Sequence, residues 1–245
     1  MRSYLNKNYQ NLEEIANNQK NKYLENTPFP HIEFQDFFCD ELMNEIIKEF
    51  PSNLDILGIK HENEVEKKFA LPVYDKLSES AKYLINQLNS FEFVNFLNKI
   101  TGIKEALIPD PYLEGGGYHE LKQNGFLNIH SDFNIHLKTK LDRRVNVLIY
   151  LNKDWEENFG GSLELWDKEM KKCEKKITPT FNKVVIFNTN DFSYHGNPKK
   201  ISHPQKVSRK SIALYYYSYG RKIKLQINLR NFLVSFIINQ DRKLL

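Results

Sequence analysis

The sequence predicts a mainly β protein with added helices, namely a double-stranded β-helix (jelly roll) with N-terminal helices packed on one sheet. Two observations predict this fold class. Helical apolar spacing is confined to the first 107 residues, whereas short apolar runs separated by turn residues follow from about residue 108. With 245 residues, the chain has a length that suits one domain. We therefore expect a helical layer over 1–107, a jelly-roll core over 108–220 and a C-terminal extension over 221–245.

The first 50 residues are expected to form two helices around an extended segment. Residues 8–25 are polar with sparse apolar positions, which suits an exposed helix. The following segment contains Pro28 and Pro30, which block a helix. Asp40 is a candidate N-cap for a short helix that ends at Pro51.

Residues 51–107 are expected to contain a loop and then two helices. The stretch 51–74 mixes charges with little periodicity, so we interpret it as a loop. Apolar residues recur at helical spacing from about 76 to 101, and the pattern breaks near Asn89 and Ser90.

The jelly-roll core is predicted from short apolar runs of strand length. Gly115 to Gly117 open this part of the chain, and Gly160, Gly161 and Pro179 interrupt it. Many short strands at such spacing favour an antiparallel sandwich or barrel. The runs are FLNIH (126–130), VNVLIYLN (145–152), SLELW (162–166), KVVIFN (183–188) and SIALYYYS (211–218).

The composition excludes several classes of protein. Hydrophobic residues make up 40% and charged residues 27% of the chain, which excludes a disordered chain. The net charge of +4 comes from scattered side chains, so we expect no nucleic-acid partner. No apolar run approaches the roughly 20 residues that span a bilayer, so we expect no membrane contact. Two distant cysteines, Cys39 and Cys173, indicate a reducing, cytoplasmic location.

His130 and Asp132 are the first candidate metal ligands. They lie two residues apart at the end of a predicted strand, and alternate residues of a strand share one face. An imidazole and a carboxylate would therefore point to one place. This short pattern also occurs as an exposed polar pair.

His195 is the candidate third ligand. It follows the apolar run KVVIFN and precedes a turn that contains Gly196 and Pro198. Two histidines and one carboxylate leave three positions of an octahedral iron free on one face. The same ligands suit a hydrolytic zinc site, so this triad alone leaves both chemistries open.

Arg209 and Ser211 add a candidate anion site. They lie two residues apart and so face the same side of a predicted apolar strand. A guanidinium on such a strand is costly to bury unless it meets an anion, and its planar shape suits a carboxylate.

The region from Gly115 to about Gly220 resembles the iron(II)- and 2-oxoglutarate-dependent dioxygenases, in their prolyl 4-hydroxylase-like branch. The resemblance rests on four segments and covers a little under half of the chain. They are GGGYHELKQNGFLNIHSDFN (115–134), RRVNVLIYLNKDWEENFGGSLELWD (143–167), VVIFNTNDFSYHGNP (184–198) and SRKSIALYYYS (208–218).

The resemblance implies a role for six residues. His130, Asp132 and His195 would bind iron. Arg209 would bind the remote carboxylate of 2-oxoglutarate, with Ser211 and Tyr150 assisting. Gly160 and Gly161 match the tight turn after the strand that carries this tyrosine.

The sequence departs from the family pattern at two positions. Collagen-type prolyl hydroxylases usually have lysine where this chain has Arg209, although other branches use arginine. Many relatives have a tyrosine nine residues before the first iron ligand, where this chain has Leu121. Tyr118 or His119 is the nearby candidate to complete that part of the pocket.

Other histidines and tryptophans are assigned less direct roles. His119 is expected to line the pocket or the sheet, and His136 to face substrate or solvent. His31 is interpreted as a surface or packing residue, while His61 and His203 fall in polar loops. Trp155 and Trp166 are expected to pack in the core or at its rim.

The resemblance implies hydroxylation of an unactivated C–H bond with release of succinate and CO2. The cofactors would be Fe(II), 2-oxoglutarate and O2, with ascorbate as a candidate reductant. The substrate would be a prolyl residue of a peptide or a small metabolite, contacted by loops 51–76, 133–142 and 196–208. Two alternatives are a non-catalytic jelly-roll protein that binds a metabolite or sugar, and a zinc hydrolase with the same triad.

Overall fold

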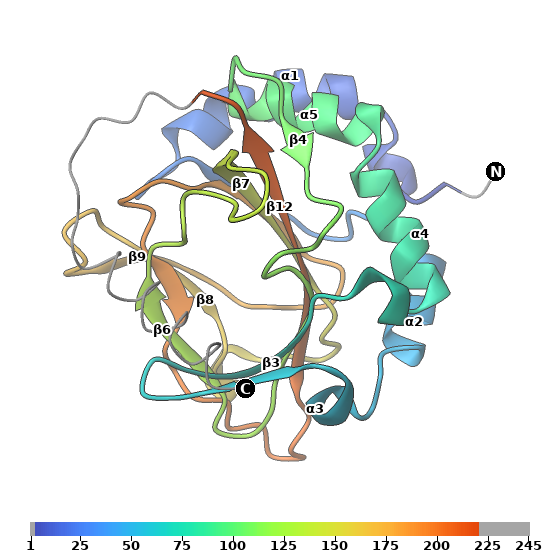
Figure 1. Cartoon of the computed structure of the whole chain (residues 1–245), viewed down its shortest axis with the longest axis vertical. Coiled ribbons are helices and arrows are strands. Elements are labelled where there is room, and N and C mark those ends of the chain that lie inside the picture. Colours follow the sequence, from blue (N-terminus) through green and yellow to red (C-terminus); the bar gives the residue numbers. More distant parts are fainter. Residues whose placement is uncertain (1–2, 221–245) are drawn as a thin grey trace.

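The computed structural model describes residues 3–220, in which one large curled sheet carries helices on its outer face (Figure 1). The C-terminal extension expected over 221–245 lies outside the described residues. The α-helices are α1 (Leu12–Glu25), α2 (Asp40–Lys48), α3 (Leu54–Leu57), α4 (Glu79–Leu88) and α5 (Phe91–Thr101). Short 3₁₀ turns are Lys7–Tyr9, Tyr74–Lys76 and Glu157–Phe159.

The strands of the sheet come from both halves of the chain. The N-terminal half contributes β1 (His31–Phe34), β2 (Ile59–Glu62) and β3 (Glu66–Leu71). The C-terminal half contributes β4 (Ile108–Pro109), β5 (Gly117–Leu121), β6 (Phe126–His130), β7 (Asp142–Tyr150), β8 (Leu163–Trp166), β9 (Cys173–Ile177), β10 (Val184–Asn188), β11 (His195–Asn197) and β12 (Arg209–Ser218).

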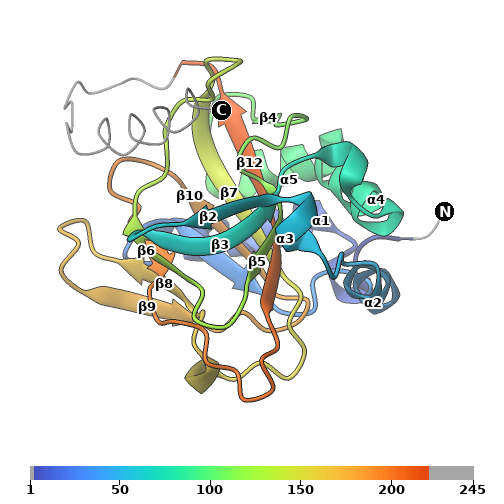
Figure 2. The same cartoon turned by 60° about the horizontal axis from the view of Figure 1, so that its bottom comes forward.

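All of these strands pair antiparallel, in the order β1-β10-β7-β12-β5-β3-β6-β11-β8-β9. Strand β2 adds to β3, and β4 adds to β12. The sheet curls so that β6, β8 and β9 lie opposite β7 and β12 across the interior (Figures 1 and 2). The predicted fold class, a jelly roll with helices on one sheet, is confirmed.

The two helices predicted between residues 76 and 101 are confirmed, and serine caps explain where each begins. Ser78 accepts a hydrogen bond from the backbone N–H of Ala81 at the start of α4. Ser90 does the same for Phe93 at the start of α5. Gly102, with φ +66°, ends α5 in the left-handed conformation that favours glycine.

Two expectations about the N-terminal half were wrong in detail. Residues 51–74 are not a loop, because they contain α3, β2 and β3. The charges on β2 and β3 concealed a two-stranded hairpin, in which charged pairs across the strands replace the usual apolar alternation. The N-cap of α2 is Cys39 rather than Asp40, which is the first helical residue.

The main core lies between the helices and the outer face of the sheet. On β12, Ile212, Leu214 and Tyr216 face this core and are at most 2% exposed. Arg209, Ser211, Ala213 and Tyr215 alternate with them and face the interior of the curl. The helical layer therefore holds the outer face of the sheet and leaves the inner face for a site.

No helix among residues 3–220 has the length and apolar character needed to cross a bilayer. Cys39 and Cys173 are both unpaired.

The packing of α5 gives a test of this core. Phe96 is 1% exposed and lies 6.2 Å, ring centre to ring centre, from Phe37. We expect Phe96→Ala to lower the free energy of unfolding in urea by about 3–5 kcal/mol, because it leaves a cavity. Phe91 is 84% exposed on the same helix. Its change to alanine should cost less than about 0.5 kcal/mol, and equal losses for both variants would contradict this packing.

Candidate metal centre and cosubstrate site

Strands β6 and β11 bring the three predicted metal ligands together. His195 pairs with His130 in the antiparallel register of these strands, and Asp132 follows two residues after His130. The Oδ1 atom of Asp132 lies 3.6 Å from Nε2 of His130, and its Oδ2 atom lies 3.4 Å from Nε2 of His195. One ligand atom from each residue fits within 4.8 Å of the others, which is a spacing that a single metal ion can bridge.

Both imidazoles are held in the tautomer that a metal requires. Nδ1 of His130 donates to the carbonyl of Asn128 at 2.8 Å, and Nδ1 of His195 donates to the carbonyl of Ser193 at 2.9 Å. In this tautomer the lone pair of each ring is on Nε2, which faces Asp132. Burial lowers the pKa of His195 to about 4, so this ring stays neutral near pH 7.

Asp132 is held ionised by side chains that the sequence analysis did not identify. Nη2 of Arg143 lies 3.0 Å from its Oδ2 atom, and the Asn146 amide donates to the same oxygen at 2.7 Å. Burial alone would raise the pKa of Asp132, but Arg143, His195 and His130 outweigh it and hold that pKa well below its ordinary value.

Arg143 is itself fixed by its surroundings. Its side chain is 1% exposed, its Nε donates to the Asn146 amide oxygen, and its Cζ lies 3.4 Å from the ring centre of Tyr215. Tyr216 and Tyr217 are consecutive on β12, but their partners on β7, Val145 and Arg143, are two residues apart. Strand β7 therefore contains a bulge of one extra residue. This extra residue turns Arg143 to the same face as Asn146, which regular alternation would not do.

The sides of the site differ in exposure. The side chain of His195 is 7% exposed and that of Asp132 12%, whereas that of His130 is 27% exposed. The Phe187 ring covers His195 at 4.7 Å between ring centres. Solvent therefore reaches the triad from the side of His130.

Arg209 lies on the inner face of β12 as a buried cation. It is 4% exposed, and the residues that the structure describes offer it no carboxylate. Its Nε donates to the carbonyl of Gly161 at 2.9 Å, and Nη1 donates to the hydroxyl of Ser211 at 3.4 Å. Its Cζ lies 4.9 Å from the ring centre of Tyr150, which pairs with Ser211 across the strands.

Gly161 lets the backbone approach Arg209 closely. Its φ is +69°, and a Cβ at this position would come within 2.9 Å of Cδ of Arg209 and 2.5 Å of Cδ1 of Ile201. Burial raises the pKa of Tyr150, so its phenol stays protonated and can donate. Arg209, Ser211 and Tyr150 thus form a polar group that suits a carboxylate with paired oxygens.

Of the two candidates near Leu121, only His119 faces this side of the sheet. His119 pairs with Ser211, and burial lowers its pKa to about 3, so it is neutral. The hydroxyl of Tyr118 instead contacts Ser78 at the start of α4, and the Tyr118 ring packs on Phe50 at 4.5 Å. Leu121 packs with Trp155 and Ile201.

The expectation that His136 faces substrate or solvent was wrong. His136 is 1% exposed, and its Nε2 lies 3.3 Å from Asp110 and 3.6 Å from Glu114. Its Nδ1 accepts backbone N–H groups of Lys138 and Thr139, so it fastens the loop after Asp132. His203 packs on Phe159 at 4.4 Å between ring centres, and Trp155 is buried, which confirms its packing role.

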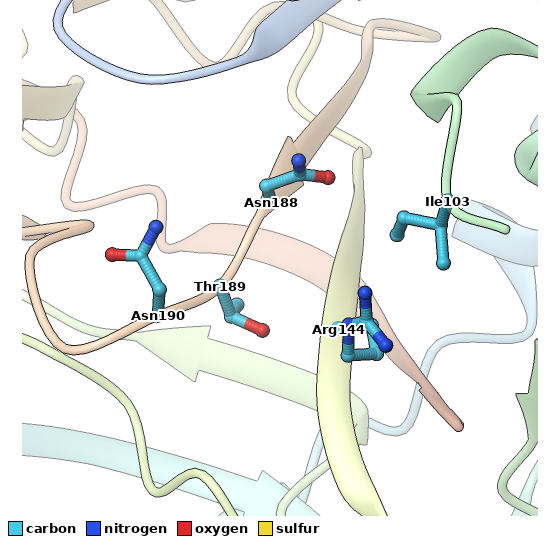
Figure 3. A pocket seen from close by; sticks show the side chains of 5 residues that line it. All are labelled: Ile103, Arg144, Asn188, Thr189 and Asn190. Carbon is cyan, nitrogen blue, oxygen red and sulfur yellow. The ribbon is translucent and has the colours of Figure 1, made fainter. Parts of the chain in front are cut away.

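A separate cavity of about 190 Å³ contains none of the predicted site residues (Figure 3). Asn188, Thr189 and Asn190 follow one another along one wall, and Arg144 and Ile103 form the other. It lacks the convergent imidazoles and carboxylate of the triad, so we assign the candidate active site to the triad and Arg209.

Comparison with known proteins identifies this arrangement. Residues 116–217 match the model of the 2OG-Fe(II) oxygenase superfamily. This part of the chain belongs to that superfamily. The prediction of the family from its motifs is confirmed.

One curated protein is also similar to part of this chain. Mouse (Mus musculus) "Prolyl 3-hydroxylase OGFOD1" is 32% identical over 79 residues, which are 31% of this chain and 14% of that protein. The chain thus matches only about a seventh of the length of this relative.

Solved structures share the fold. A Trichoplax adhaerens prolyl hydroxylase in complex with a hypoxia inducible factor peptide fragment has a TM-score of 0.59 at 19% identity, covering 86% of this chain and 92% of that one. HygX from Streptomyces hygroscopicus, with nickel, 2-oxoglutarate and hygromycin B bound, has a TM-score of 0.55 at 11% identity, covering 82% and 87%.

The residues present fit the metal and cosubstrate of a 2OG-Fe(II) oxygenase. Two imidazole nitrogens and one carboxylate are a ligand set typical of non-haem Fe(II). Arg209 supplies the buried cation that a dicarboxylate needs. The roles of His130, Asp132 and His195 as ligands, and of Arg209, Ser211 and Tyr150 in cosubstrate binding, stay predictions.

The Asn146 amide gives a test of the metal centre. We expect Asn146→Ala to weaken Co(II) binding, followed by the visible absorption of the bound ion, by about 10–100-fold, because Asp132 loses a donor that orients it. Asn86→Ala, on helix α4, should bind Co(II) as the unchanged protein does. Unaltered Co(II) affinity in Asn146→Ala would contradict this role.

Proposed function

We propose that this chain is an Fe(II)- and 2-oxoglutarate-dependent oxygenase that hydroxylates an unactivated C–H bond and releases succinate and CO2. One observation carries the proposal: two imidazoles and an ionised carboxylate converge on one point, on the same inner sheet face as a buried arginine. The membership of residues 116–217 in the superfamily supports it.

The triad would hold the iron, and each ligand is prepared by its own neighbours. The carbonyls of Asn128 and Ser193 keep Nε2 of both histidines free for the metal. Arg143 and Asn146 keep Asp132 charged and oriented. When bound, iron supplies the redox chemistry with O2 that amino-acid side chains lack.

Arg209 would bind the distal carboxylate of 2-oxoglutarate. Its Nε–H donates to Gly161 and one Nη1–H donates to Ser211. The remaining N–H groups of the guanidinium are available to donate to an anion. The Tyr150 phenol and the Ser211 hydroxyl lie beside it and can donate to the same carboxylate. Leu121, Trp155 and Ile201 form a buried apolar cluster, and Ile201 and Arg209 both lie against Gly161.

A prolyl residue of a peptide is the substrate that we propose. The Mus musculus relative is named a prolyl 3-hydroxylase, and the Trichoplax adhaerens enzyme of similar fold was solved with a peptide. A small metabolite is the second candidate, because HygX, also of similar fold, was solved with hygromycin B. We also propose a cytoplasmic location, in keeping with the unpaired Cys39 and Cys173.

A zinc hydrolase and a non-catalytic binding protein are less well supported. Neither needs a buried arginine on the inner sheet face that bears the metal ligands. A non-catalytic protein that binds a metabolite or sugar would also have no reason to hold two imidazoles beside an ionised carboxylate.

The activity is tested by incubating the protein with Fe(II), O2, ascorbate and 2-oxoglutarate, together with either proline-containing peptides or a metabolite mixture. We expect succinate release to rise with one of these substrate pools, and a product of that pool to gain one oxygen atom by mass spectrometry. Folded protein that binds Fe(II) and 2-oxoglutarate but forms no succinate would contradict the proposal.

Arg209 gives a sharper test of cosubstrate binding. We expect Arg209→Gln to raise the KM for 2-oxoglutarate by about 10–100-fold, because charge-assisted hydrogen bonds contribute about 1.5–3 kcal/mol each. Lys210 is the matched control, since it is the adjacent cation and its Nζ donates to Ser208. A KM that rises equally in Arg209→Gln and Lys210→Gln would exclude a specific role for Arg209.

A further inference from the structure

The β2–β3 hairpin carries different charged residues on its two faces. His61 pairs with Lys68, and Ile59 pairs with Ala70, so these four side chains share one face. Glu66 is two residues from Lys68 and lies on that face as well. Lys60, Glu62 and Lys67 alternate with them on the other face.

The face with Lys68 is the inner face of the sheet. Ala70 pairs with His119 on β5, and His119 pairs with Ser211, which accepts a hydrogen bond from Arg209. At its other end, β3 pairs Glu66 with Leu127 on β6, three residues before His130. Strand β3 lies between β5 and β6 (Figure 2), so its inner face spans the wall between the proposed cosubstrate and metal sites.

The inner charges form a compact, mostly buried cluster. Nζ of Lys68 lies 2.9 Å from Oε2 of Glu66, and Nδ1 of His61 lies 3.3 Å from its Oε1. The side chains of Lys68 and Glu66 are only 18% and 13% exposed. On the outer face, Lys67 and Glu62 also pair, but they are 39% and 41% exposed.

The inner cluster holds Glu66 in its charged form and leaves donors of Lys68 unused. Burial would raise the pKa of Glu66, but His61 and Lys68 outweigh it and lower that pKa to about 2. Glu66 is shared by Lys68 and His61, whereas Lys68 has Glu66 as its one ion-pair partner among residues 3–220. A lysine ammonium has three N–H donors, so Lys68 retains donors for a further acceptor.

On its inner face, β5 offers Lys68 no carboxylate, because the residues that face this side are Gly117, His119 and Leu121. His119 lies nearest along the sheet, and it is neutral because burial and the charge of Lys68 lower its pKa to about 3. The charge of Arg209 acts on His119 in the same direction, so both cations lie near this wall. An anionic group of a substrate that enters from the His130 side would meet Lys68.

We propose that Lys68 binds a carboxylate of the substrate, next to the residue that is hydroxylated, and that Glu66 and His61 position the ammonium group. This inference rests on the proposed function, and it makes Lys68 a specificity-determining residue of the same site. The substrate class is then an acidic peptide, with Asp or Glu close to the modified proline.

The test uses two pools of proline-containing peptides that differ only in charge. One pool contains Asp and Glu, and the other contains Asn and Gln at the same positions. Hydroxylation is measured by mass spectrometry as the gain of one oxygen, with Fe(II) and 2-oxoglutarate present. We expect the unchanged protein to modify the acidic pool about tenfold faster, and Lys68→Gln to reduce this ratio to within about twofold.

Two further variants separate recognition from folding. Lys67→Gln removes the same charge from the outer face of β3 and should keep the preference for the acidic pool. The double variant Glu66→Lys with Lys68→Glu keeps an ion pair but exchanges the two charges, and it should lose that preference while its thermal unfolding stays close to normal.

The outcomes distinguish this inference from the proposed function. Equal rates on both pools, or a preference that survives in Lys68→Gln, would overturn the role of Lys68 and leave the hydroxylase activity standing. A protein that binds Fe(II) and 2-oxoglutarate yet modifies neither pool would overturn the peptide substrate, and the inference with it.

Discussion

The site depends on keeping Asp132 ionised where water is largely excluded. Burial disfavours a carboxylate, yet Arg143 and the two histidines hold its pKa far below the ordinary value. Arg143 is in turn buried against Tyr215 and fixed by Asn146. A metal would therefore meet a charge that is already formed and oriented, so that little free energy is spent on arranging the ligands at the moment of binding.

The curled sheet explains how residues far apart in sequence share this site. The pairing of β6 with β11 places His195 opposite His130, and the pairing of β12 with β5 and β7 places Arg209, Ser211 and Tyr150 on the inner face. The helices cover only the outer face, where Ile212, Leu214 and Tyr216 alternate with the site residues. Strand β12 thus contributes to the hydrophobic core with one face and to the candidate site with the other.

The site residues could be predicted from the sequence where side chains alternate regularly along a strand. Prediction failed where a bulge or a charged hairpin departs from the usual pattern. The H-x-D spacing and the i, i+2 spacing of Arg209 and Ser211 follow strand alternation, so the groups that the structure brings together were foreseeable. Arg143 was not, because a bulge in β7 reverses the alternation at that point. The β2–β3 hairpin was also missed, since ion pairs occupy positions where apolar residues usually reveal a strand.

The most direct measurement is a crystal structure of the protein soaked without oxygen in Mn(II), as a stand-in for Fe(II), and 2-oxoglutarate. We expect one anomalous-scattering peak at bonding distance, about 2.0–2.3 Å, from Nε2 of His130, Nε2 of His195 and an Asp132 oxygen. The distal carboxylate of 2-oxoglutarate should lie on Arg209. A metal bound elsewhere, or a carboxylate that does not reach Arg209, would contradict the account.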